Sequence, residues 1–170
     1  MNLFLKRGFT LIELLIVISI IGILTAIVST NLQSARERAR DSRRKSDLQA
    51  IHQSLRLYYS DYQGFPTGSG GVINGCGASG TSICAWDSAF SNGSSTTYMG
   101  HLPLDPSSTS TNQITYFYHP AGNNNNFLLL TQLENASDLD KVDSQARCAT
   151  LYNGNIAGYV KDSTKDYVVC

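Results

Sequence analysis

One carboxylate, Glu13, lies within an otherwise uncharged apolar stretch, and its type and position suggest a specific chemistry. The stretch runs from Phe9 to Val28 and contains no other charged residue. An ionised group near the interior of a bilayer costs about 2.5 to 3.5 kcal/mol on insertion scales. A carboxylate in this setting therefore indicates a partner that neutralises it.

The other residues with possible chemistry form no catalytic pattern in the sequence. Gly75 to Gly80 match the G-x-G-x-x-G spacing of dinucleotide-binding loops, but Ser and Gly surround them where a strand and a helix are needed. His52, His101 and His119 belong to no H-E-x-x-H motif, and no G-x-S-x-G motif is present. We therefore expect no enzymatic activity and no cofactor.

Calcium is the one metal that remains as an alternative. Asp138, Asp140 and Asp143 are close enough in sequence to gather around such an ion. They do not follow the twelve-residue calcium-loop pattern, however, and an exposed polar turn or helix accounts for them equally simply.

The apolar stretch has the length of a membrane-spanning helix. Residues 9–28 would span about 30 Å at 1.5 Å per residue, which is the thickness of a hydrocarbon core. Gly22 and Ala26 form a small-xxx-small pair of the kind that lets two such helices approach closely. The alternative interpretation is that Gly and Ala are simply common in membrane helices.

An amphipathic helix is predicted to continue over residues 29–64. Apolar residues recur along one face at steps of three and four, at Leu48, Ile51, Leu55, Tyr58 and Tyr62. Gly64 and Pro66 end the pattern. A globular head, residues 65–170, is expected to bury this stripe.

The head is predicted to be an antiparallel β-structure after an irregular start. Residues 65–97 are rich in Gly, Ser and Thr and indicate an irregular connection. Residues 98–170 contain the strand candidates Gln113–His119, Phe127–Leu133, Tyr159-Val160 and Tyr167–Val169. The predicted fold is α+β, with a long N-terminal helix packed against a small antiparallel sheet.

Composition fits this plan. The chain has 170 residues, of which 42% are hydrophobic and 15% are charged, enough for one ordinary domain plus an anchor and too apolar for a disordered polymer. Its formal net charge is zero, but the segment after Pro66 is acidic and the helix before it is basic.

The block Lys6-Arg7-Gly8-Phe9-Thr10-Leu11-Ile12-Glu13 resembles the type III signal of type IV pilins and type II secretion pseudopilins. The resemblance implies that residues 1–8 are a cytoplasmic leader, which prepilin peptidase removes after Gly8. It also implies methylation of the Phe9 amine by the family's peptidase/methyltransferase. The expected partner of Glu13 is then the Phe9 amine of a neighbouring subunit, met during assembly.

A second stretch is similar to the major pseudopilins. Leu102-Pro103-Leu104-Asp105-Pro106 followed by Tyr116-Phe117-Tyr118 looks like their L-P-x-D-P and Y-x-Y motifs. The usual Trp-Gly after D-P is replaced by Ser107-Ser108. In that group a loop binds calcium, which is the ground for considering Asp138, Asp140 and Asp143.

The resemblance implies a pilin-like, non-enzymatic subunit of a helical homo-oligomer, either a type IV pilus or a type II secretion pseudopilus. Its partners would be the prepilin peptidase, the membrane platform protein of the assembly machinery and the lipid bilayer. The expected location is the cytoplasmic membrane, single-pass with the head outside, and later a surface or periplasmic filament. The alternative is a membrane-anchored binding module, for example a DNA-binding minor pilin.

Six basic residues follow the membrane segment: Arg36, Arg38, Arg40, Arg43, Arg44 and Lys45. Counted by the positive-inside rule, they would place the head in the cytoplasm. We set this aside because the processing signal requires a cytoplasmic leader and the cysteines suit an oxidising compartment. The patch would bind nucleic acid or anionic lipid, pair with acidic heads of neighbouring subunits, or form a solvated helix face.

Four cysteines, Cys76, Cys84, Cys148 and Cys170, allow three full pairings, and sequence alone does not choose between them. We favour Cys76 with Cys84 and Cys148 with Cys170. The second pair would contribute about 3 kcal/mol in the chain-entropy model. It also looks like the C-terminal disulfide loop of many pilins.

Overall fold

The computed structural model describes residues 9–93, 96–109, 116–154 and 156–170, without the side chains of residues 27–31. The chain divides into two compact units, residues 1–37 and residues 38–170. The helices are α1 (Leu11–Tyr62), α2 (Asp140–Arg147) and α3 (Ala149–Tyr152). The strands are β1 (Thr67–Ser69), β2 (Val72–Cys76), β3 (Ser82–Cys84), β4 (Phe90–Ser91), β5 (Thr97–Met99), β6 (Phe117–Ala121), β7 (Asn126–Gln132) and β8 (Asp166–Val169).

The first unit consists of the N-terminal part of α1. Its apolar side chains from Phe9 to Leu24 are exposed all around the helix, with Phe9 itself 87% exposed. Among the described residues, no helix meets the length and apolar character needed to cross a membrane. The predicted span covers residues 9–28. The side chains of its last two residues, Ile27 and Val28, are not among those that the structure describes.

The second unit contains the rest of α1, residues 38–62, and all the strands. Leu48, Ile51, Leu55 and Tyr58 are buried, as the predicted stripe requires, whereas Tyr62 remains 47% exposed. The helix ends because Gln63 adopts a positive φ of 53°, and Gly64 and Pro66 follow.

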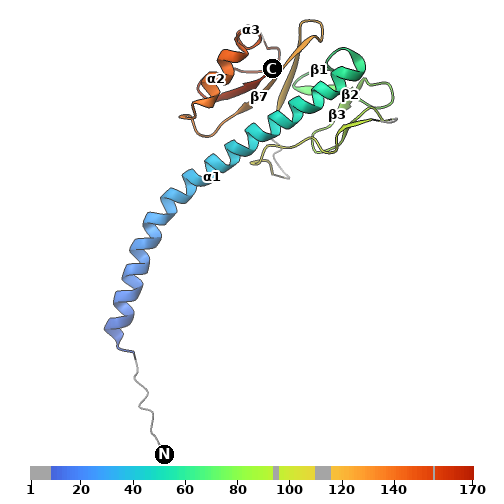
Figure 1. Ribbon diagram of the computed structural model, residues 1–170. Helices are drawn as coiled ribbons and strands as arrows, with labels where there is room; N and C mark the ends of the chain where they lie inside the picture. The colour runs from blue at the N-terminus through green and yellow to red at the C-terminus, as the bar shows by residue number, and fades with distance from the viewer. Residues whose placement is uncertain (1–8, 94–95, 110–115, 155) are drawn as a thin grey trace, which may run out of the picture. The chain divides into compact units, whose positions relative to one another are not determined.

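The sheet β6-β7-β8 is antiparallel and lies between two helical layers. Leu129 of β7 packs in the same core as the α1 stripe, whereas Leu128 and Leu130 pack with Tyr152 and Ile156 beyond α2. Figure 1 shows α2 and α3 beside this sheet, on the side away from α1. Both faces of β7 are covered, which explains why its residues 127–130 form a continuous apolar run.

Two of the predicted strands differ from those observed. Residues 113–115 lie outside the described residues, and β6 continues beyond the expected end at His119 to Ala121. Tyr159-Val160 is not a strand, and Val160 is 88% exposed. The connection from β7 to β8 instead contains α2 and α3, which the sequence analysis missed.

The expectation of an irregular connection over residues 65–97 was wrong. This segment forms the sheet β1-β2-β3 and strand β4, which pairs with β5. Gly70 and Gly71 have φ values of 63° and 88°, so they form the tight turn between β1 and β2 that other residues would strain. The glycines that suggested irregular structure are therefore turn residues of short hairpins.

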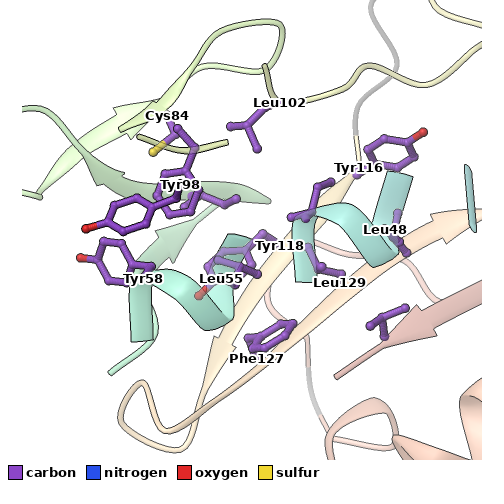
Figure 2. Packing of buried hydrophobic residues seen from close by; sticks show 14 of the residues in the cluster. Leu48, Leu55, Tyr58, Cys84, Tyr98, Leu102, Tyr116, Tyr118, Phe127 and Leu129 are labelled. Atoms are coloured by element: carbon purple, nitrogen blue, oxygen red, sulfur yellow. The ribbon is translucent and has the colours of Figure 1, made fainter. Parts of the chain in front are cut away.

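One aromatic-rich core joins these sheets to α1. Figure 2 shows Leu48, Leu55 and Tyr58 of α1 facing Tyr98, Tyr116 and Tyr118 from the strands and the segment beside them. The Tyr58 ring lies 5.2 Å from the Tyr98 ring in an edge-on arrangement. Burial of these large side chains is the main term that holds the distal part of α1 on the head.

Both favoured disulfides are present, Cys76 with Cys84 and Cys148 with Cys170. The first connects β2 with β3, and the second attaches the last residue of the chain to the end of α2. The Cys148–Cys170 bond closes a loop with a sequence separation of 22 residues, for which the chain-entropy model gives about 3 kcal/mol.

Candidate functional site

Glu13 has a partner within its own chain, which the sequence analysis missed. Its Oε2 accepts hydrogen bonds from the backbone N–H and the hydroxyl of Thr10, both at 2.8 Å. The Thr10 hydroxyl in turn accepts a bond from the Glu13 N–H at 3.3 Å. This reciprocal pair is a capping box, and it satisfies backbone donors at the start of α1. The Thr-x-x-Glu spacing was the signal that could have revealed it.

The surface around Glu13 is open to another molecule. Phe9 and the apolar side chains that follow it are exposed, and Gly8 lies outside the described residues. A Cβ added at Gly22 would meet no atom of this chain within 4 Å, and Ala26 is exposed. The processing role of Gly8 and Phe9, and the assembly role of Glu13, Gly22 and Ala26, stay predictions.

The basic residues after this segment do not form a uniformly solvated face. Arg44 is only 3% exposed, although the sequence placed it in a surface patch. Its guanidinium donates to Asp105 at 2.6 and 2.9 Å and to Asp41 at 2.6 Å. Glu134 lies 2.8 Å from the same guanidinium. We call these four residues the Arg44 network.

The Arg44 network connects α1 with two distant segments of the head. Asp41 also accepts backbone N–H bonds from Glu134 and Asn135 at 2.9 and 2.8 Å. Asp105 further accepts a bond from the backbone N–H of Ser107 at 2.8 Å. Ser107 thus helps to hold the carboxylate that binds Arg44.

Electrostatics favours the charged forms of Arg44 and Asp105. Burial alone would lower the pKa of Arg44, but the hydrogen bonds that its guanidinium donates to three carboxylates outweigh burial and raise the pKa above its usual value. Burial would raise the pKa of Asp105, yet hydrogen bonds from Arg44 and Ser107 hold it below its usual value. Arg44 and Asp105 therefore each stabilise the charged form of the other.

Lys45 lies between two of the aspartates that were considered as calcium ligands. Its Nζ is 2.6 Å from a carboxylate oxygen of Asp138 and 2.6 Å from one of Asp140. Asp143 is exposed on α2. Within the described residues, no group of three or more potential ligands is arranged to hold a metal ion. The calcium alternative is not supported, because an ammonium group takes the bridging position.

Of the remaining basic residues, two form ion pairs and two are exposed to solvent. Arg40 pairs with Glu134, and Arg43 lies 3.3 Å from Asp47. Arg36 and Arg38 are exposed. Acidic partners, which one of the alternatives placed on neighbouring subunits, are thus supplied largely by the chain's own head. This leaves less positive charge for nucleic acid or anionic lipid than the sequence suggested.

We expect the protein to lose stability in acid, because carboxylates paired with Arg44 and Lys45 must then be protonated. The pKa values of Asp105, Glu134 and Asp138 are all held below their usual values in the folded protein. The unfolded chain therefore binds protons first, so the stabilisation is complete above about pH 5 and is lost as pH falls through the lower folded values. Urea unfolding of the full chain in detergent should show a free energy that declines slightly between pH 7 and 5, because burial lowers the pKa of His52, and steeply below about pH 5. A free energy that does not change down to pH 3 would contradict the prediction.

Comparison with known proteins finds a family motif at the N-terminus and relatives that match part of the chain. Residues 4–29 match the prokaryotic N-terminal methylation motif. The chain is 39% identical over 67 residues to type II secretion system core protein G of Escherichia coli, covering 39% of this chain and 46% of that protein. It is 44% identical over 56 residues to the type IV major pilin protein PilA of Myxococcus xanthus, covering 33% of this chain and 26% of that protein.

These similarities have a limited extent. The chain spans a little under half the length of the core protein G relatives that it matches, including that of Vibrio cholerae at 35% identity. No solved structure is significantly similar to the chain. The fold of the head is therefore described from this structure alone.

Proposed function

We propose that this chain is a non-enzymatic filament subunit. It carries a prokaryotic N-terminal methylation motif, and 39% and 33% of its length match type II secretion system core protein G and the type IV major pilin protein PilA. The filament is a type IV pilus or a type II secretion pseudopilus. The observation that carries the proposal is the methylation motif followed by a helix whose apolar side chains are exposed on every side. Such a surface needs lipid or other copies to cover it.

Before assembly, residues 9–28 anchor the chain in the cytoplasmic membrane with the head outside. The two disulfides support this side, because they persist in oxidising compartments. The prepilin peptidase cleaves after Gly8 and the new amine of Phe9 is methylated. Glu13 then leaves or extends its contact with Thr10 to meet the Phe9 amine of the preceding subunit.

In the filament, the apolar helices form a bundle and the heads form the surface. Each subunit contacts the next head-to-tail, which is the kind of contact that produces an open fibre. Gly22 and Ala26 let neighbouring helices approach closely, because nothing in the chain itself fills the space at Gly22. The membrane platform protein lifts the subunits into the fibre, which lies at the cell surface or in the periplasm.

Mass analysis of the intact protein isolated from cells tests processing. The expected protein begins at N-methylated Phe9 and has all four thiols oxidised. A Gly8→Val variant, in which the residue before the cut is too large for the motif, should keep residues 1–8 and stay out of filaments. An unprocessed wild-type protein with residues 1–8 still attached, or filaments made from the unprocessed variant, would contradict the proposal.

A further inference from the structure

A cavity of about 280 Å³ lies where α1 ends, and every residue that lines it is uncharged. Its polar groups come from separate segments: the end of α1, strands β1 and β2, the turn after β2 and the turn between β6 and β7. Its lining includes Tyr58, Tyr62, Gln63, Asn74, Asn123 and Asn124. The proposed filament function does not use this cavity.

One buried polar atom on its wall lacks a partner. Asn74 Oδ1 is inaccessible to solvent and accepts no hydrogen bond from the described residues. Burying an unsatisfied acceptor costs about 1 to 3 kcal/mol, so such an atom calls for an explanation. In the unliganded chain this atom is shielded from solvent, so a bound molecule that donates a hydroxyl would supply the missing bond once the Asn74 side chain turns toward the cavity.

The rim of the cavity is held in an unusual backbone conformation. Gln63, Asn123 and Asn124 have φ values of 53°, 55° and 66°, in the left-handed region that residues other than glycine avoid. The backbone N–H of Phe65 donates to the Asn124 carbonyl at 2.7 Å and connects the two turns. Strain of this kind, fixed by the surrounding structure, is common at ligand sites.

A second cavity, of about 460 Å³, adjoins the first, and Phe65 and Asn125 line both. Its wall adds one charged residue, Arg56, and the aromatic residues Tyr59 and Phe127, whose rings lie 4.8 and 4.6 Å from the ring of Phe65. In the first cavity, the rings of Tyr58 and Tyr62 stack 4.4 Å apart. The two cavities together present aromatic surfaces bordered by amide groups.

From this arrangement we propose that the end of the head binds a neutral oligosaccharide. Amide side chains offer both donors and acceptors, which match hydroxyls that also do both. Aromatic faces carry negative charge density and suit the weakly positive C–H faces of sugar rings. The first cavity, which holds the amide groups, offers no counter-ion for an anionic ligand, and Arg56 of the second has the one charged side chain of the combined lining among the described residues. The combined volume is typical of a small-molecule site.

The test uses the full chain in a zwitterionic detergent, because sugar-headed detergents would compete. Saturation-transfer NMR measures binding of maltotetraose, cellotetraose and chitotetraose, with tetragalacturonate as an acidic probe. We expect at least one neutral probe to bind at concentrations below about 10 mM, and to bind more tightly than the acidic one. Failure of every neutral probe in that range, or equal binding of the acidic probe, would overturn the proposal.

Two matched variants test whether binding depends on the unpaired Asn74 Oδ1. Asn74→Leu removes an unsatisfied buried atom at nearly the same volume, so the melting temperature should be unchanged or higher, while affinity should fall about tenfold. Trp86→Phe removes Nε1, the other buried polar atom without a partner among the described residues, which lies outside both cavities. It should bind like the wild type. Wild-type affinity in Asn74→Leu, or an equal loss in both variants, would refute the site.

Discussion

Arg44→Ala should lower the free energy of unfolding by about 3 to 5 kcal/mol, because it removes one partner from a buried set of charges. The side chains of Asp41 and Asp105, only 2% and 4% exposed, would remain without their cation. Both are acidic, so each also repels the other once Arg44 is gone. Urea unfolding of the full chain in detergent, followed by circular dichroism, measures the change.

Arg43→Ala is the matched control for this prediction. Arg43 is adjacent in sequence and also pairs with an aspartate, Asp47, but its side chain is 70% exposed. Exposed pairs contribute about 0 to 1 kcal/mol, so this variant should unfold nearly as the wild type does. Equal losses in the two variants would show that burial of the Arg44 network does not set its contribution.

Glu13→Ala should abolish or severely reduce incorporation into filaments while leader cleavage persists. The substitution removes both the negative charge proposed to meet the Phe9 amine and the acceptor that caps α1 through Thr10. The measurement compares sheared filaments with the membrane fraction, using the processed mass to confirm cleavage. Normal filament yield from this variant would rule out the docking role.

Glu13→Gln separates the two functions of this side chain. Glutamine still accepts the Thr10 N–H bond and serves in capping boxes, but it carries no charge. If the charge is what matters, Glu13→Gln should assemble as poorly as Glu13→Ala. If capping alone matters, Glu13→Gln should assemble normally and Thr10→Ala should be defective. The second pattern would contradict docking through an ion pair.

Periodicity was a good guide wherever a single rule governed the structure. The stripe from Leu48 to Tyr58 was predicted and is buried, because steps of three and four residues describe one face of a helix. Strand β7 was predicted within one residue of its bounds, because a short apolar run between turns has few alternatives. Both disulfides followed the favoured pairing.

The failures came where contacts distant in sequence decide the outcome. Arg44 was grouped with its exposed neighbours, because nothing local shows that Asp105, which is 61 residues away, reaches it. The hairpins in residues 65–97 were missed because they are short and rich in turn residues, so composition resembled a loop. Asp138 and Asp140 were considered as metal ligands because their sequence does not reveal Lys45 between them.

Lys45 has a further consequence for the loop before α2. Its ammonium group belongs to α1 and is covalently fixed, so dilution or a chelating agent cannot remove it from Asp138 and Asp140. Wherever the head lies, this counter-charge stays with it. The two carboxylates thus need no divalent cation from the surroundings to balance their charge.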